Sequence, residues 1–133
     1  MKKLILLFTV IGFIATAGIS KVNNDGNSFS VKHNNYQACI DACNKCITSC
    51  KEVEKKCGKD KKMAEMEKAC KECITACEKA IKAMKEDKNV KEECSRCADV
   101  CANCAKECEK SDMPVCKKCA EDCRSCEKQC REM

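Results

Sequence analysis

The sequence has very few of the residues that normally fill a protein core. Its 133 residues, enough for one domain, contain no Trp, one Tyr and three Phe, and no Leu occurs after residue 20. A domain of this size usually packs its interior with Leu, Val, Ile and Phe. Only cysteine, with 18 copies, is abundant enough to replace them. The cysteines must therefore explain both the fold and the function.

The scarcity of histidine and the weak net charge argue against two classes of function. Acid–base catalysis usually relies on His or on carboxylates with shifted pKa values, and a cysteine nucleophile needs an activating base. With one His and no carboxylate at the cysteine spacing, we predict that the protein is not an enzyme. The formal net charge of +5 falls to about +3 without Lys2 and Lys3, and its signs are mixed along the chain. That charge is too weak and too scattered for a nucleic-acid partner.

The first 20 residues, MKKLILLFTVIGFIATAGIS, have the features of an export signal. Two lysines precede an apolar stretch over residues 4–14, and Ala15-Thr16-Ala17 is a small-x-small cleavage site. We predict a signal peptide over residues 1–17, with cleavage as late as residue 20 as the second choice. The apolar stretch is short for a membrane span, so we expect no membrane attachment after cleavage and a periplasmic or secreted product. Residues 18–35 are polar and Asn-rich, which predicts a flexible lead-in.

The cysteines are spaced by three or four residues, apart from one step of seven, and this is the period of one face of an α-helix. A strand would need steps of two. Short loops make consecutive helices antiparallel, so residues 36–133 are predicted to form an all-α, antiparallel four-helix bundle with a cysteine-lined core. The expected helices lie near 35–57, 60–86, 89–110 and 113–132. The four sets of cysteines are Cys39, Cys43, Cys46, Cys50 and Cys57; Cys70, Cys73 and Cys77; Cys94, Cys97, Cys101, Cys104 and Cys108; and Cys116, Cys119, Cys123, Cys126 and Cys130.

Residues that interrupt or cap helices fall between these segments. Gly58 stands where a helix C-cap glycine belongs, and Asn89 with Glu92 resembles a capping box. The run Ser111-Asp112-Met113-Pro114 offers two good N-caps and a proline that a first helical turn tolerates. Asn34 or Asn35 is expected to cap the first helix.

Antiparallel packing stacks the core positions of these four helices in layers, three of which consist of cysteine alone. From one end, the predicted layers are Tyr36, Met84, Val90 and Met133; Cys39, Ala80, Cys94 and Cys130; Cys43, Cys77, Cys97 and Cys126; Cys46, Cys73, Cys101 and Cys123; Cys50, Cys70, Cys104 and Cys119; Val53, Met66, Cys108 and Cys116; and Cys57, Met63, Ser111 and Met113.

Three chemistries suit a core of thiols. Disulfides are common in exported, cysteine-rich chains, but helical neighbours have Cβ atoms about 5–6 Å apart, against roughly 3.5–4.5 Å in a disulfide. Zn²⁺ prefers closed sites of four ligands, and four thiolates for each ion leave surplus charge in the core. Cu(I) is soft and selects thiolates, and one Cu⁺ for each thiol proton keeps the core neutral. We therefore favour multiple Cu(I) ions, about one per cysteine, over a metallothionein-like buffer of Zn²⁺ or another thiophilic metal.

The cysteine spacing over residues 94–108, repeated over 116–130, resembles that of the bacterial copper storage proteins. The resemblance extends over about residues 36–133. It implies a four-helix bundle whose inward-pointing cysteines hold many Cu(I) ions, and assembly of bundles into tetramers. The partners it suggests are copper ions, with a copper chaperone or a client cuproenzyme. The chain departs from the exported members in lacking a twin-arginine signal.

Four further residues are candidate ligands outside the set of cysteines. Met63, Met66 and Met113 fall with Cys57 at one end of the predicted layers, and their soft thioethers are suited to passing Cu(I) into the core. The alternative, equally weighted, is that they only fill an irregular core end. His33, the only His, is a candidate at the other end, although no role is the favoured interpretation for a lone His in a polar segment.

Overall fold

The computed structural model describes residues 27–133, with side chains from Tyr36 onward, and all of the regular structure in this range is helical. The elements are α2 (Asn27–Cys57), the short 3-10 helix η1 (Lys61–Met63), α3 (Ala64–Glu86), α4 (Val90–Glu109) and α5 (Pro114–Arg131). The all-α prediction is therefore confirmed. Within the described range, no helix combines the length and the apolar character that a membrane span requires. The predicted signal peptide lies outside the described residues.

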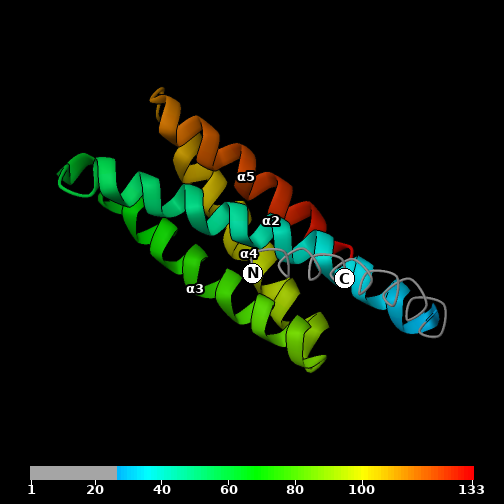
Figure 1. Cartoon of the computed structure of the whole chain (residues 1–133). Helices are drawn as coiled ribbons and strands as arrows, with labels where there is room; N and C mark the ends of the chain where they lie inside the picture. The colour runs from blue at the N-terminus through cyan, green and yellow to red at the C-terminus, as the bar shows by residue number, and fades with distance from the viewer. Residues whose placement is uncertain (1–26) are drawn as a thin grey trace, which may run out of the picture. The chain divides into compact units, whose positions relative to one another are not determined.

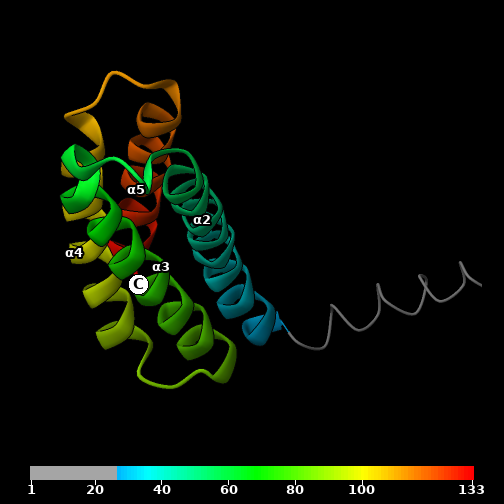
Figure 2. The ribbon, with the colours of Figure 1, turned by 90° about the vertical axis from the view of Figure 1, so that its left-hand side faces the viewer.

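Residues Asn35–Met133 form one compact unit, an antiparallel four-helix bundle (Figure 1). The α2–α3 and α4–α5 connections lie at one end of this bundle, and the α3–α4 connection lies at the other (Figure 2). Consecutive helices therefore run in opposite directions, as the short predicted loops require. We call the first end, with its two connections, the α2–α3 end, and the other the α3–α4 end.

The helix bounds agree with the sequence for the last three helices and differ for the first. The helix α2 begins at Asn27 instead of near residue 35. The expectation that Asn34 or Asn35 caps this helix is wrong, and residues 27–35 are helical instead of part of a flexible lead-in. The physical reason is that neither Gly nor Pro occurs between Gly26 and the end of the helix, so nothing in the backbone stops it.

The caps of α4 and α5 differ in detail from the predicted ones. Asn89 is the N-cap of α4, but its side chain makes no capping hydrogen bond and its backbone is left-handed, with φ of 55°. Asn tolerates that conformation, so the expected capping box with Glu92 does not form. Pro114 occupies the first turn of α5 as predicted, although the N-cap is Met113. The Ser111 hydroxyl accepts a hydrogen bond from the Met113 amide at 3.2 Å.

Gly58 ends α2 by allowing a close approach of the backbone. Its amide donates to the carbonyl oxygen of Glu54 at 2.9 Å. A Cβ atom at this position would lie 2.5 Å from that same oxygen, closer than real Cβ atoms come. The glycine is therefore required by space at this turn, and its φ is not positive.

The core of the bundle is made mainly of sulfur. All 18 cysteines are buried, and the largest apolar side chains buried with them are Val53, Met66 and Met84. A free thiol packs as a small hydrophobic group, so cysteine fills the core positions that Leu and Phe occupy in most other proteins. The predicted placement of every cysteine on a core position is confirmed.

Candidate metal centre

The four helices bring cysteines of distant sequence into contact across the bundle axis. Within the predicted layers, the Sγ atoms of Cys46 and Cys73 are 3.3 Å apart, and those of Cys46 and Cys123 are 3.4 Å apart. Cys39 and Cys130 are separated by 3.5 Å, and Cys50 and Cys119 by 3.6 Å. Each of the 18 is a free thiol. The alternating steps of three and four residues thus place the thiols of different helices at one level.

These levels are not separate sites, because sulfurs of neighbouring levels are nearly as close as sulfurs of one level. Cys77 and Cys101 belong to adjacent predicted layers and have Sγ atoms 3.9 Å apart. Groups of four cysteines with Sγ atoms all within 4.8 Å of one another overlap along the axis. They include Cys43, Cys77, Cys97 and Cys126; Cys46, Cys73, Cys77 and Cys101; Cys46, Cys50, Cys73 and Cys123; Cys50, Cys104, Cys119 and Cys123; and Cys70, Cys104, Cys108 and Cys119.

The result is a continuous column of sulfur along the bundle axis. A path with every Sγ–Sγ step at 3.9 Å or less runs through Cys39, Cys130, Cys43, Cys126, Cys77, Cys101, Cys46, Cys123, Cys119, Cys50, Cys104 and Cys70. Such a column has no internal boundary at which one four-ligand site would end and another begin. It offers every ion a choice of neighbouring thiols.

Thiols in the column share their protons unequally. Hydrogen bonds from Cys126 and then Cys130 lower the pKa of Cys43 far below its ordinary value. Hydrogen bonds to Cys104 and then Cys119 raise the pKa of Cys50. The hydrogen bonds between thiols therefore shift the pKa values of neighbouring cysteines in opposite directions. A soft cation that enters such a network displaces protons, since the thiolate is the metal ligand.

The α2–α3 end presents sulfur at the surface. Met113 is 38% exposed, the one large hydrophobic side chain so exposed within the described range. The Cys57 thiol donates to its Sδ atom at 3.9 Å. One level deeper, the Cys116 thiol donates to the Sδ atom of Met66 at 3.4 Å. Burial, and next the nearby Cys116, raise the pKa of the Cys57 thiol.

The structure therefore gathers Cys57, Met66, Met113 and Cys116 at one end, as the layers predicted. Met63 is partly buried against the same core. His33 falls within α2, but its side chain lies outside the described part of the chain, so its proposed role at the other end is not tested.

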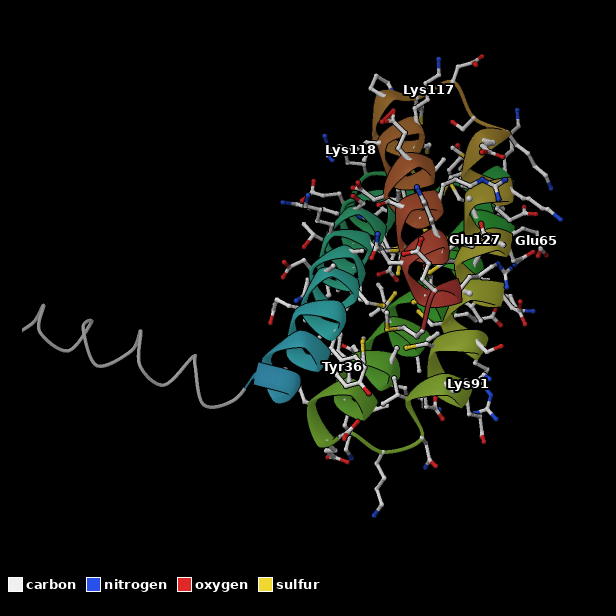
Figure 3. All side chains as sticks on the ribbon, turned by 90° about the vertical axis from the view of Figure 1, so that its right-hand side faces the viewer. Tyr36, Glu65, Lys91, Lys117, Lys118 and Glu127 are labelled. Atoms are coloured by element: carbon white, nitrogen blue, oxygen red, sulfur yellow. The ribbon has the colours of Figure 1, made fainter. Side chains whose placement is uncertain are left out.

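The α3–α4 end is covered by apolar side chains and a hydrogen bond. Tyr36, Val90 and Met133 are partly buried against the core, and Met84 is 3% exposed. The Tyr36 hydroxyl donates to Oδ1 of Asp87 at 2.8 Å. This bond links α2 to the residue that follows α3, and Asp87 itself has a left-handed backbone, with φ of 52°. Figure 3 shows Tyr36 at this end of the bundle.

Sequence reasoning missed one polar contact beside the column. Ser49 is the one buried polar residue of the described range, and its hydroxyl donates to Asp122 across the α2–α5 interface. Lys118 forms an ion pair with the same carboxylate at 3.1 Å. Ser49 precedes Cys50 and so flanks the cysteine face. No rule of sequence spacing predicts that Ser49 contacts Asp122, which is 73 residues away.

Comparisons with known proteins agree with this core. A family model described as copper storage protein matches residues 32–133. Among solved structures, the Cu(I)-bound copper storage protein BsCsp3 is 37% identical, with a TM-score of 0.71, over 74% of this chain and 97% of its own. The apo copper storage protein 3 of Bacillus subtilis is 38% identical, with a TM-score of 0.69, over 72% of this chain and 95% of its own.

A protein of Nitrosospira multiformis is 31% identical, with a TM-score of 0.68, over 74% of this chain and 94% of its own. A search of curated protein sequences gives no match. The family model covers most of the chain, and the matches to the two copper storage protein structures cover nearly all of those chains. The chain therefore belongs to the copper storage protein family.

Proposed function

We propose that this protein stores Cu(I) through the 18 cysteine thiols of its core, at about one ion per cysteine. The observation that carries the proposal is the continuity of the column, in which Sγ atoms follow one another at 3.9 Å or less from Cys39 to Cys70. A Cu(I) ion accepts low coordination numbers and thiolate ligands, so it can bridge two sulfurs while each sulfur bridges two ions. The copper-bound relative supports this choice of metal.

Charge balance supports a high copper content. Each Cu⁺ replaces one thiol proton, so the filled core keeps the charge of the empty one. A Zn²⁺ ion held by four thiolates would instead leave two negative charges in a core whose cysteines are almost all fully buried, and buried uncompensated charge is costly. The role is therefore one of storage by binding, with no chemical turnover.

We also propose that Cu(I) enters at the α2–α3 end. Met113 is exposed there, and the Cys57 thiol lies against its sulfur. Met66 and Cys116 continue the soft ligands inward, and Met63 lies on the same end of the core. The supporting contrast is the α3–α4 end, where Tyr36 and Met84 cover the column.

Export, assembly and delivery complete the proposal. The N-terminal segment supports removal of residues 1–17 and a periplasmic or secreted product. The family resemblance supports assembly of bundles into tetramers, and a copper chaperone or client cuproenzyme as the partner that delivers or receives copper.

An anaerobic titration of the fully reduced full chain with Cu(I), against a competing chromophoric chelator, tests the storage role. We expect binding to continue to about one ion per cysteine, roughly 18. Each ion bound should release about one proton, which a pH indicator in weak buffer measures.

Saturation at four or five ions would contradict the shared column, because that number corresponds to separate four-thiolate sites. A parallel titration with Zn²⁺ is the control. If Zn²⁺ binds at that ratio and competes with Cu(I), a metallothionein-like buffer replaces copper storage as the function.

A further inference from the structure

The sulfur-lined α2–α3 end is surrounded by positive charge. Residues 55–62 read KKCGKDKK, which is five lysines against one acidic residue. The corresponding eight residues at the other end, 85–92, read KEDKNVKE, with three lysines against three acidic residues. The two ends therefore differ in charge as well as in the exposure of their sulfur atoms. We call Lys55, Lys56, Lys59, Lys61 and Lys62 the lysine collar.

The lysine collar is unneutralised. All five side chains are exposed, and none takes part in an ion pair within the part of the chain that the structure describes. Lys71, Lys110 and Lys118 do form ion pairs with carboxylates. The other lysines of the described range, like those of the collar, form none, so the collar is distinguished by its excess of lysines over acidic residues. The collar charges are therefore available to a molecule that approaches from solution.

The collar is held around the soft ligands by the local fold. Lys55 and Lys56 lie in the last turn of α2, directly before Cys57. Lys61 and Lys62 form η1 with Met63, and the Asp60 side chain fixes this turn by accepting from the Lys62 amide at 3.0 Å. Lys117, in the first turn of α5, lies at the same end of the bundle (Figure 3). On this second side Lys117 lies beside Glu109, Asp112 and Glu121. The excess of positive charge therefore belongs to the α2–α3 connection.

Such a surface does not suit the approach of a free cation. Several unpaired lysines within one Debye length of about 10 Å repel Cu⁺ and attract anions. The sulfurs inside the collar nevertheless select Cu(I). Both properties are satisfied together when the metal arrives inside a complex whose total charge is negative.

We propose that the α2–α3 end is a docking site for small anionic Cu(I)–thiolate complexes. The lysine collar attracts the complex, and Cys57, Met113 and Cys116 take its metal by ligand exchange. This inference rests on the proposed entry of Cu(I) at this end. It adds the chemical class of the donor, an ion carried by two thiolates on anionic carriers.

The exchange balances without a redox step. Copper stays Cu(I), and each Cu–S bond to the carrier is replaced by a Cu–S bond to a protein thiol. The proton of that protein thiol passes to the departing carrier thiolate. The carrier leaves as a thiol with its own anionic groups, and the collar is free to bind the next complex.

Stopped-flow loading of the reduced full chain tests the proposal. Two donors are compared at matched copper and thiol concentrations: Cu(I) with 2-mercaptoethanesulfonate, whose complex is anionic, and Cu(I) with cysteamine, whose complex is cationic. The readout is the growth of Cu–thiolate absorbance. We expect the anionic donor to load about tenfold faster at low salt, and the difference to shrink as ionic strength rises.

Two charge variants locate the effect. In the collar variant, Lys55, Lys56, Lys59, Lys61 and Lys62 are changed to Gln. In the matched control, Lys79, Lys82, Lys85, Lys88 and Lys91 are changed to Gln, which removes the same charge from exposed positions toward the α3–α4 end. We expect the preference for the anionic donor to disappear in the collar variant and to persist in the control. Circular dichroism verifies that both variants remain helical.

Equal loading of the wild type by both donors would overturn the inference, and so would an equal loss of preference in both variants. These results leave the storage role intact if each donor still fills the column. Failure of both donors to load any copper would instead contradict the proposed function itself.

Discussion

The two ends of the bundle are built from the same four helices and yet have opposite surfaces. At the α3–α4 end, Met84 is almost fully buried, and Tyr36 is fixed by its hydrogen bond to Asp87. At the α2–α3 end, Met113 is exposed, and Cys57 retains 5% of its surface accessibility. The column of sulfur is thus covered at one end and reachable at the other.

We infer from this difference that metal access depends on a few residues outside the cysteine repeat. The repeat itself is nearly symmetric, because the cysteine-only layers occupy the middle of the bundle. Both end layers contain methionines, and what differs is their exposure: Met84 is 3% exposed, whereas Met113 is 38% exposed. With the proposed entry of Cu(I) at the α2–α3 end alone, loading and unloading compete for the same route.

The largest expected effect comes from filling the column that both ends share. Cu(I) cross-links all four helices, and each ion bound at a thousandfold excess over its Kd stabilises the fold by about 4 kcal/mol. For a domain of this size, each kcal/mol corresponds to roughly 4–8 °C in Tm. We therefore expect the Tm of the loaded protein, measured by circular dichroism, to exceed that of the metal-free protein by tens of degrees.

Stripping the copper with a strong Cu(I) chelator should return the Tm to its starting value. Equal Tm values for the loaded and the metal-free protein would contradict the idea that copper cross-links the helices in the core. Such a result would place the bound copper on the surface instead.

The next largest effect should follow from changing the thioethers of one end. Replacing Met63, Met66 and Met113 by Leu keeps the volume but removes the soft ligands. We expect Cu(I) loading by stopped flow to slow about tenfold, equivalent to about 1.4 kcal/mol in the barrier, with little change in final capacity. The matched variant replaces Met84 and Met133 at the other end by Leu.

The matched variant should load at the wild-type rate. Equal slowing of both variants would mean that the methionines of the α2–α3 end have no special role in loading. Slowing of the second variant alone would place the entry of Cu(I) at the α3–α4 end.

A smaller effect is expected midway between the ends, where Ser49 donates to Asp122. Changing Ser49→Ala leaves the partly buried Asp122 carboxylate with one partner fewer, which costs roughly 1 kcal/mol of unfolding free energy. Thr48→Ala is the control, because the exposed Thr48 hydroxyl only donates to the Asn44 carbonyl oxygen of its own helix at 3.1 Å. Urea unfolding of the metal-free variants measures both.

Neither substitution should change which end admits copper. A change in loading rate in Ser49→Ala would show that stability of the α2–α5 pair controls access, and it would weaken the role given to the methionines.

The sequence predicts the column well because the helical period and the cysteine period coincide. Steps of three and four residues fix which face is buried, and short loops fix the direction of each helix, so the level of Cys43, Cys77, Cys97 and Cys126 follows from counting. The overlap between levels does not follow from counting, because it depends on rotamers that carry one Sγ toward the next level. The contact of Cys77 with Cys101 is of this kind.

Contacts between polar residues could not be predicted in the same way. Tyr36 and Asp87 are 51 residues apart and belong to no repeat. The early start of α2 was missed because an Asn-rich segment is typical of a loop, although nothing in it prevents helix. The lysine run over 55–62 is plain in the sequence. Its relation to Met113 appears only when the α4–α5 connection is placed at the same end.

The smallest effect concerns the bond that covers the α3–α4 end. The hydrogen bond to Asp87, followed by burial and by the negative charge of Asp87, raises the pKa of Tyr36 above its ordinary value of 10.0. Only the neutral phenol donates, so this bond stabilises the fold below pH 10 and its contribution is lost as the pH rises through the folded pKa. Because the side chain is only partly buried and its hydrogen bond is exposed, Tyr36→Phe should cost less than about 1 kcal/mol.

The pKa can be measured directly because the chain has one tyrosine. The experiment uses Cu(I)-loaded protein, in which the thiols do not titrate. The NMR chemical shift of a ¹³C-labelled Tyr36 Cζ atom then reports the ionisation of the phenol. Asp87→Asn removes the charge, and Asp87→Gly also removes the acceptor at a left-handed position that glycine adopts freely. We expect the Tyr36 pKa to fall from wild type to Asp87→Asn to Asp87→Gly. An unchanged pKa in Asp87→Gly would mean that Asp87 does not hold Tyr36 over this end, and that the apolar side chains cover it alone.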